Sequence, residues 1–250
     1  LILLEMSKIF GTLMKTVYSV GNIPIDIKQK RLDPIKAQEK ELRKLLKKAS
    51  NTAFGEHYNF DEILNSNDIL NTYREKVPVF DYNSMYKNRW FRALNGESYV
   101  SWPGKIKYFA LSSGTSEASS KFIPITNNML SSIKKASIRQ ILAATKYDFP
   151  LDFYDKGFLM IGGSTHLQYN GTYYSGDLSG ISASKLPFWF EYFYKPGRKI
   201  SRTTDWNAKL DEMVKKAPSW DIGVLVGVPS WVQILLERII KEYNLNTIHD

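Results

Sequence analysis

Cysteine is absent from the 250 residues, and histidine occurs only three times. Without cysteine the chain can form no disulfide bond, no thiolate zinc site and no cysteine nucleophile. His57, His166 and His249 are scattered, and none has the paired spacing of metal-binding histidines. The sequence therefore predicts no metal site built from histidine or cysteine, and the absence of cysteine fits a reducing, cytoplasmic location.

Long hydrophobic runs are also missing. No segment approaches the roughly eighteen uninterrupted apolar residues that a membrane-spanning helix needs. The apolar run at residues 1–4 is too short for the core of a signal peptide, and Glu5 and Lys8 interrupt it. We therefore expect neither a membrane span nor a membrane partner.

Positive charge is in excess, because 34 Lys and Arg stand against 25 Asp and Glu and give a net charge of +9. Such a charge attracts polyanions, including nucleic acids and nucleotides. The basic residues are densest over residues 28–48, where Asp33 and Pro34 predict the start of an amphipathic helix. Its expected inner stripe is Leu42, Leu45, Leu46 and Ala49. Since Glu39 and Glu41 interrupt the basic run and no aromatic platform accompanies it, we favour a solvated helix face over a nucleic-acid surface.

Three apolar runs predict buried strands, each followed by a loop and a helix: residues 108–111, 157–161 and 222–226. This alternation predicts an α/β fold with a mainly parallel sheet. No Gly-x-Gly-x-x-Gly follows any of the runs, so a Rossmann unit is not expected. The pattern divides the chain into a helical segment over 1–97 and an α/β part over 98–250.

Other patterns predict local structure. Residues 59–75 fit a helix broken at 65–67, and Thr126, Asp205 and Pro229 fit the starts of three later helices. The aromatic run over 187–194 fits a core strand or a hydrophobic wall. The tyrosine-rich stretch from His166 to Asp177 fits either a flap over a ligand or an ordinary surface excursion.

The loop between residues 111 and 122 has the composition of a phosphate-binding loop. Its hydroxyls can donate to phosphate oxygens, Gly114 allows the backbone amides to turn inward, and Lys121 adds positive charge. It is not a Walker A loop, because Lys121 is followed by Phe122. Composition alone leaves open a solvated serine-rich connector, for which Ser, Gly and Thr are ordinary residues.

The same loop resembles the first nucleotide-binding motif of the GH3 family of acyl acid amido synthetases. The residues that carry this likeness are Ser112, Ser113, Gly114, Thr115, Ser116 and, five residues on, Lys121 followed by Phe-Ile-Pro. Further family landmarks follow in family order at residues 52–55, 77–82, 162–164, 175–177 and 227–231. The loop lacks the second glycine that many members carry before the lysine. Ordered agreement over residues 30–250 is far more specific than one motif.

The resemblance implies the large amino-terminal domain of an adenylate-forming, luciferase-like enzyme, here incomplete. Such an enzyme activates a carboxylic acid with ATP and Mg²⁺ and then transfers the acyl group to an amino acid. In this chain Ser112, Ser113, Gly114, Thr115 and Ser116 would hold the phosphates, with Lys121 contributing. Val228, Pro229 and Trp231 would lie near the acyl pocket, although for Trp231 we favour a core role.

Family members are about twice as long as this chain, so the resemblance implies that the chain alone is inactive. Two other function classes stay open. One is another adenylate-forming ligase, such as an acyl-CoA synthetase, and the other is a basic binding protein without enzymatic activity. The identity of the acid, the identity of the amine and the oligomeric state do not follow from the sequence.

Overall fold

The computed structural model describes Thr16 and residues 33–112, 121–143, 147, 149–186 and 188–247. Contacts divide these residues into two compact units. The helical unit comprises the described residues from 33 to Ile133 together with Tyr169–Ser175. The parallel-sheet unit comprises those of 134–168 and 176–247. None of the described helices combines the length and the apolarity that crossing a membrane requires.

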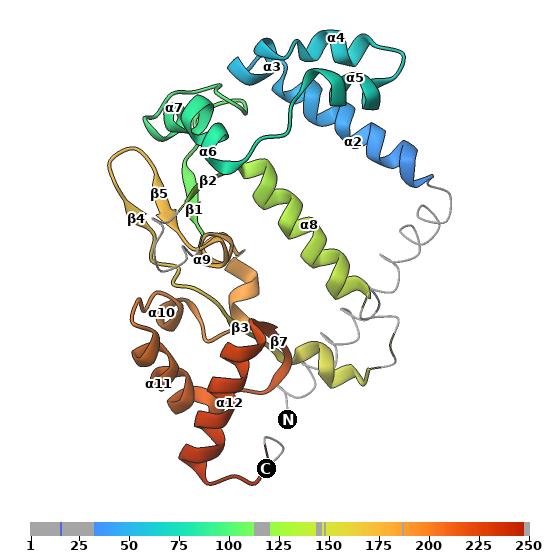
Figure 1. Cartoon of the computed structure of the whole chain (residues 1–250). Helices are drawn as coiled ribbons and strands as arrows, with labels where there is room; N and C mark the ends of the chain where they lie inside the picture. The colour runs from blue at the N-terminus through green and yellow to red at the C-terminus, as the bar shows by residue number, and fades with distance from the viewer. Residues whose placement is uncertain are drawn as a thin grey trace. The chain divides into compact units, whose positions relative to one another are not determined.

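Four helices at the start of the helical unit pack around a shared apolar core (Figure 1). They are α2 (Pro34–Ala49), α3 (Ala53–His57), α4 (Phe60–Asn65) and α5 (Ile69–Lys76). The buried side chains of this core are Leu46, Ala49, Phe60, Ile63, Ile69 and Val77. The expected break within residues 59–75 is confirmed by the gap between α4 and α5.

Helix α2 begins where the sequence predicts. The Asp33 carboxylate accepts a hydrogen bond from the backbone N–H of Ile35 at 2.9 Å, and Pro34 occupies the first turn. Leu46 and Ala49 are buried as expected, but Leu45 is 45% exposed, so its place on the inner stripe was wrong. Adjacent residues point about 100° apart around a helix, so burying Leu46 turns Leu45 outward.

The connection from α2 to α3 is built by Thr52 and Gly55. The buried Thr52 hydroxyl donates to the Ala49 carbonyl at 2.7 Å and accepts from the Gly55 N–H at 3.1 Å. A Cβ atom on Gly55 would lie 2.1 Å from the Ala49 carbonyl oxygen, so no larger residue fits. Folding therefore explains why Thr52 and Gly55 occur in the landmark over residues 52–55.

The helical unit continues through three short turns into a four-stranded sheet. The turns are α6 (Tyr82–Met85), the π-helical η1 (Tyr86–Trp90) and α7 (Phe91–Leu94). The sheet has the order β2-β1-β5-β4, with β1 (Tyr108–Leu111), β2 (Phe122–Ile125), β4 (Gln168–Tyr169) and β5 (Tyr174–Gly176). Its apolar side covers a second core of Ala93, Val100, Ile106, Phe109 and Tyr173.

The first predicted strand does not join a parallel sheet. β1 pairs antiparallel with β2, so that Tyr108 lies opposite Ile125 and Leu111 opposite Phe122. The strand over residues 122–125 was not predicted from the sequence; this apolar run is extended and pairs with the run before the loop. Pro124 lacks an N–H donor, and β2 accordingly occupies an edge of the sheet.

The tyrosine-rich stretch after His166 contributes two short strands to this sheet. It contains β4 and β5, and Tyr173 packs edge-on against Phe109 with ring centroids 4.8 Å apart. Helix α8 (Asn127–Ala143) follows β2, and the boundary between the two units falls within it. Thr126 caps α8 as predicted, its hydroxyl accepting from the Met129 N–H at 3.0 Å.

The parallel-sheet unit confirms the other two predicted strands as neighbours. Its sheet has the order β6-β3-β7, with β3 (Gly157–Ile161) parallel to both β6 (Tyr194–Lys195) and β7 (Ile222–Gly227). The helices are α9 (Leu178–Ala183), α10 (Arg198–Ser201), α11 (Trp206–Lys216) and α12 (Pro229–Tyr243). Three short 3₁₀ turns complete it: η3 (Leu151–Asp155), η4 (Phe188–Tyr192) and η5 (Ala217–Ser219).

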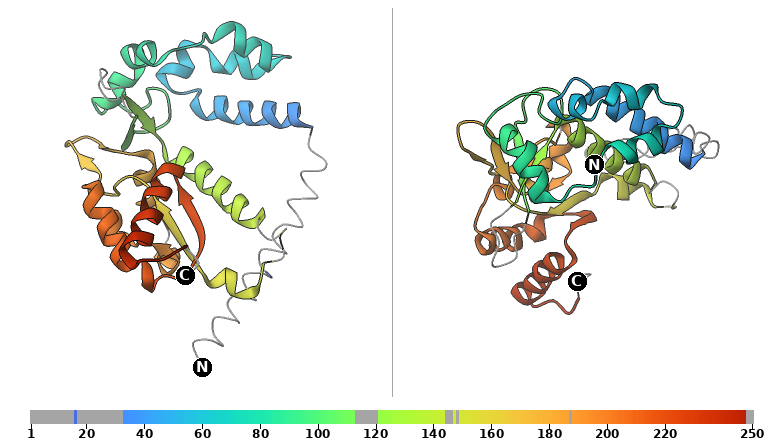
Figure 2. Two further views of the ribbon diagram at one scale, coloured as in Figure 1. Left: turned by 60° about the horizontal axis from the view of Figure 1, so that its bottom comes forward. Right: turned by 45° about the horizontal axis from the view of Figure 1, so that its top comes forward.

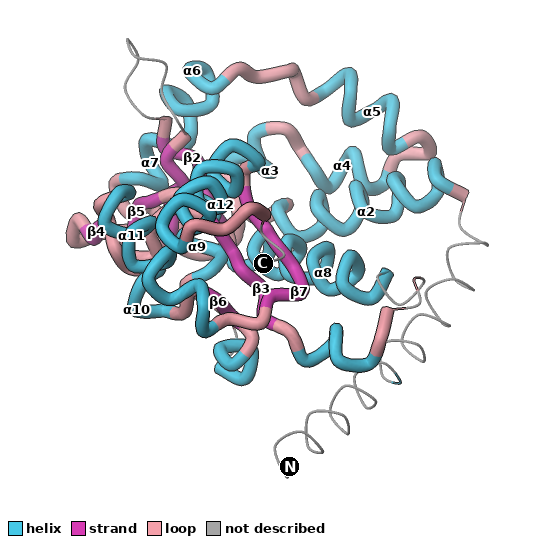
Figure 3. The backbone as a smooth tube through the Cα atoms, turned by 90° about the horizontal axis from the view of Figure 1, so that it is seen from below, coloured by secondary structure: helices cyan, strands magenta, loops and turns pink. Residues whose placement is uncertain are grey.

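Helices α11 and α12 pack against each other, and α12 contacts β7 (Figures 2 and 3). The shared core consists of Leu159, Ile161, Ile200, Leu210, Met213, Val214, Leu235 and Ile239. The prediction that the third strand is buried was wrong, because Leu225 is 46% and Val226 44% exposed. β7 is an outer strand of the described sheet, and these two side chains stay about half exposed there.

The aromatic run predicted as a core strand or wall forms η4 and then the short strand β6. Asp205 begins α11 as predicted, its carboxylate accepting from the Ala208 N–H at 2.7 Å. Pro229 lies in the first turn of α12, also as predicted. The division into segments 1–97 and 98–250 stays a prediction.

Replacing Thr52 by Val should destabilise the helical unit by about 2 kcal/mol, because the isosteric side chain leaves the buried Gly55 N–H without a partner and takes the hydroxyl donor from the Ala49 carbonyl, which still accepts from the backbone N–H of residue 52 at 3.1 Å. Urea unfolding followed by circular dichroism measures this. Thr72→Val is the matched control, since its hydroxyl donates to the Asp68 carbonyl at an exposed position. We expect the control to stay within about 0.5 kcal/mol of the unaltered chain. Equal effects of the two changes would contradict the structural role of Thr52.

Candidate functional site

The predicted phosphate loop is the connection between β1 and β2. Ser113, Gly114, Thr115 and Ser116 lie outside the described residues, so their predicted contacts stay predictions. At the base of the loop the Ser112 N–H donates to the Lys121 carbonyl at 3.1 Å. The loop is thus the turn of a hairpin, and not a passage from a strand into a helix.

Lys121 lies at the base of this hairpin beside Tyr82. Its ammonium lies 5.2 Å from the centre of the Tyr82 ring, within the range of a cation–π interaction. The Tyr82 hydroxyl accepts from the Phe122 N–H at 2.9 Å. Hydrogen bonds from Ser84, helped by the charge of Lys121, hold the pKa of the Asp81 carboxyl below its ordinary value. The landmark over residues 77–82 therefore positions the cation of the candidate loop.

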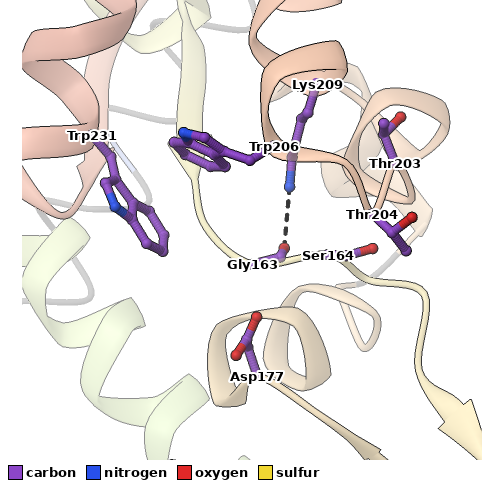
Figure 4. A pocket seen from close by; sticks show the side chains of 8 residues that line it. All are labelled: Gly163, Ser164, Asp177, Thr203, Thr204, Trp206, Lys209 and Trp231. Atoms are coloured by element: carbon purple, nitrogen blue, oxygen red, sulfur yellow. Dashed lines mark hydrogen bonds between the residues drawn. The ribbon is translucent and has the colours of Figure 1, made fainter. Parts of the chain in front are cut away.

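A pocket of about 400 Å³ lies within the parallel-sheet unit (Figure 4). Gly163 and Ser164 reach it from the turn after β3, and Asp177 from the start of α9. Thr203 and Thr204 precede α11 and line it as well. The remaining lining residues are Trp206 and Lys209 of α11 and Trp231 of α12. Three of the landmark motifs, at 162–164, 175–177 and 227–231, thus meet at one place.

Lys209 is the most deeply buried charge of the pocket, with 3% of its surface exposed. Its ammonium donates to the Gly162 carbonyl at 2.8 Å and to the Gly163 carbonyl at 3.2 Å. Burial lowers the pKa of Lys209 below its ordinary value, and the nearby negative charge of Asp177 opposes that shift. The lysine therefore fixes the turn after β3 and brings positive charge to the pocket.

The same turn is fixed from α9. The Ser179 hydroxyl accepts from the Gly163 N–H at 3.0 Å. A Cβ atom on Gly163 would lie 2.0 Å from a carboxylate oxygen of Asp177, so the glycine is required for this close approach. Asp177 itself is exposed, and within the described part of the chain its carboxylate has neither a hydrogen bond nor an ion pair.

Of the three residues predicted near an acyl pocket, only Trp231 lines this one. Its ring lies 4.7 Å from that of Trp206, centre to centre, and it also packs against the core of the unit. Val228 is 47% exposed, and Pro229 occupies the first turn of α12. Neither residue lines the pocket, and the binding role of all three stays a prediction.

Sequence reasoning missed Lys209 and Asp177 as candidates. Lys209 lies three residues after Trp206 and four before Met213, on the stripe expected to face the core. A lysine on the apolar stripe of a helix was the available signal. Asp177 is the last residue of one landmark motif, but the sequence around it gave no sign that its carboxylate would be unpaired.

Replacing Lys209 by Ala should destabilise the parallel-sheet unit by about 2–3 kcal/mol, because two carbonyls lose a charged donor and the packed side chain leaves a gap. The midpoint of urea unfolding reports the change. Lys215→Ala is the control on the same helix, at a side chain that is 72% exposed. It should shift stability by less than about 0.5 kcal/mol. A Lys209 variant as stable as the control would show that the two carbonyl bonds contribute nothing to folding.

The fold is shared with two solved structures. A GH3.15 acyl acid amido synthetase is 15% identical, with a TM-score of 0.66 over 92% of this chain and 39% of that protein. An AtGH3.15 acyl acid amido synthetase in complex with 2,4-DB is 17% identical, with a TM-score of 0.58 over 81% of this chain and 35% of that protein. The chain thus spans well under two thirds of the length of either. The likeness confirms the predicted mixed α/β fold class.

Among curated protein sequences, none matches this chain. The model of the GH3 family N-terminal domain, however, matches residues 26–210. That stretch contains the hairpin loop and every lining residue of the pocket except Trp231. Because the match covers well over half of the 250 residues, the chain belongs to the GH3 family.

Proposed function

We propose that the chain is the nucleotide- and acid-binding part of an acyl acid amido synthetase. Such an enzyme joins a carboxylic acid to the amino group of an amino acid and uses ATP. The observation that carries the proposal is the family match over residues 26–210, and the similar fold of two acyl acid amido synthetases supports it. A small-molecule acid as substrate is in keeping with the 2,4-DB bound to one of them.

The reaction would proceed in two steps. A carboxylate oxygen attacks the α-phosphorus of ATP, the bond to the β-phosphate breaks, and pyrophosphate leaves. The amine nitrogen then attacks the acyl carbon of the adenylate, AMP leaves, and the nitrogen gives up a proton as the amide forms. The first step develops negative charge on the phosphate oxygens, which fixed donors and cations stabilise.

Roles for individual residues follow from the position of the loop. Ser112, Ser113, Gly114, Thr115 and Ser116 would hold the β- and γ-phosphates from the hairpin. The position of Lys121 above the Tyr82 ring, at the base of that hairpin, supports its part in the same site. Val228, Pro229 and Trp231 would contact the acyl group.

Magnesium is the customary companion of ATP and would neutralise phosphate charge. In the described ranges, no three His, Cys, Asp or Glu side chains gather into a site for a metal ion. The described side chains therefore form no magnesium site by themselves. This is in keeping with the usual reliance of Mg²⁺ on substrate phosphates and water. We therefore assign no step to it.

The test is acid-dependent exchange of pyrophosphate into ATP by the complete reading frame, with a panel of aryl, indolyl and fatty acids. At least one acid should support exchange. Ser113→Ala and Thr115→Ala should each lower the rate by about a hundredfold, because each removes a donor to developing charge. Ser132→Ala, at an exposed position on α8, is the control and should leave the rate unchanged.

Each part of the proposal has its own contrary result. The absence of exchange with every acid would refute adenylation, and exchange that survives both loop substitutions would refute the assignment of the loop. Product formed with coenzyme A and not with amino acids would identify an acyl-CoA synthetase instead. We expect the 250 residues alone to show no turnover.

A further inference from the structure

The pocket of the parallel-sheet unit carries two opposite charges that the chain itself leaves incompletely paired. Lys209 supplies an ammonium and Asp177 a carboxylate, and both line the same cavity. The two groups make no ion pair with each other within 4 Å. A pocket lined by opposite charges is complementary to a ligand that carries both signs.

The ammonium of Lys209 retains binding capacity. A lysine has three N–H donors, and the Gly162 and Gly163 carbonyls accept two of them. One N–H is left for a ligand acceptor. Since the side chain is 3% exposed and anchored by those two bonds, its charge is fixed in place before any ligand arrives.

The carboxylate of Asp177 has no hydrogen bond or ion pair within the described residues. It stands at the residue before α9, where a carboxylate commonly caps the helix, yet it makes no capping hydrogen bond. It packs instead beside Gly163, at a position where any side chain on that residue would collide with it. Neither oxygen has a hydrogen-bond donor within the described residues, so the carboxylate can accept from a ligand in the pocket.

The other walls provide hydroxyls and aromatic surface. Thr203 and Thr204 line the pocket, and within the described residues neither hydroxyl has a hydrogen-bond partner. Trp206 and Trp231 form an apolar wall with their rings 4.7 Å apart. Figure 4 shows the two indoles together to one side of the Gly163 turn, with the threonines to the other side.

We propose that this pocket binds the zwitterion of an α-amino acid with an aromatic or large apolar side chain. The ammonium of the amino acid lies against Asp177, its carboxylate takes the remaining Lys209 donor and a threonine hydroxyl, and its side chain packs on the two indoles. The volume of about 400 Å³ accommodates such a molecule. This assignment locates the amine substrate of the proposed reaction and so rests on that proposed function.

The experiment is isothermal titration calorimetry of the 250-residue chain with three probes of one shape. L-phenylalanine carries both charges, 3-phenylpropionate lacks the ammonium, and 2-phenylethylamine lacks the carboxylate. L-phenylalanine should bind, and each analogue should bind about tenfold more weakly or worse, because it leaves one fixed charge unpaired. No binding of L-phenylalanine, or equal binding of either analogue, would overturn the proposal.

Asp177→Asn tests the carboxylate. It should weaken the binding of L-phenylalanine by about tenfold and leave the binding of 3-phenylpropionate no weaker. Asp177 is exposed, so the variant is expected to fold, and circular dichroism verifies this. Asp211→Asn is the matched control, because that carboxylate is 59% exposed and pairs with Arg238 on the surface. It should leave binding unchanged. A control that weakens binding as much as Asp177→Asn would overturn the role of Asp177.

The two proposals fail separately. Amino-acid binding is measured without ATP, and pyrophosphate exchange is measured without an amine. Binding without exchange would refute the adenylation chemistry and leave the amino-acid pocket standing. Exchange without binding would leave adenylation standing and refute this pocket as the place of the amine.

Discussion

A buried ammonium, that of Lys209, joins the segments on which the parallel-sheet unit depends. It reaches from α11 to two successive carbonyls after β3 and so fastens the helix to the end of the central strand. Removing a charge from water is costly, and the carbonyl dipoles offset part of that cost. The Ser179 hydroxyl ties α9 to the same turn. The turn after β3 is therefore fixed from two sides before it contributes to any site.

The helical unit holds its own cation by a related arrangement. Tyr82 presents its ring to the ammonium of Lys121 and accepts the backbone N–H of Phe122 with its hydroxyl. Asp81 begins the helix that carries Tyr82, its carboxylate accepting the N–H of Ser84 at 2.7 Å. One short helix thus fixes both the backbone and the charge at the base of the hairpin. In each unit a lysine is positioned by contacts within the chain, before any ligand binds.

The features that the sequence predicted correctly are local ones. Asp33, Thr126 and Asp205 begin helices because a side-chain oxygen meets an N–H two or three residues on, a geometry that spacing alone determines. Strand pairing is not local. Residues 108–111 could pair with any strand, and nothing in their own pattern favoured the antiparallel partner at 122–125. The same limit explains the outer strand β7, whose apolar run resembles a buried one.

The pocket shows a second limit of sequence reasoning. Its residues come from five places between 163 and 231, and only their close approach gives them a common role. Lys209 was recognisable as a lysine on an apolar stripe, whereas the free carboxylate of Asp177 depends on a distance to Gly163 that no spacing predicts. The family landmarks marked the right segments without stating what each side chain does.

The landmarks differ in how far folding explains them. The Thr52 hydroxyl accepts from the Gly55 N–H and donates to the Ala49 carbonyl at the end of α2, and only glycine fits at position 55. Folding therefore accounts for both residues. Gly163 and Asp177 differ, because the glycine is required by a carboxylate that bonds to nothing in the described chain. An exposed, unpaired carboxylate adds little to stability, yet it excludes every side chain from position 163. Folding gives one reason for that constraint, because the charge of Asp177 favours the buried ammonium of Lys209, and a cationic group bound in the pocket would give a second.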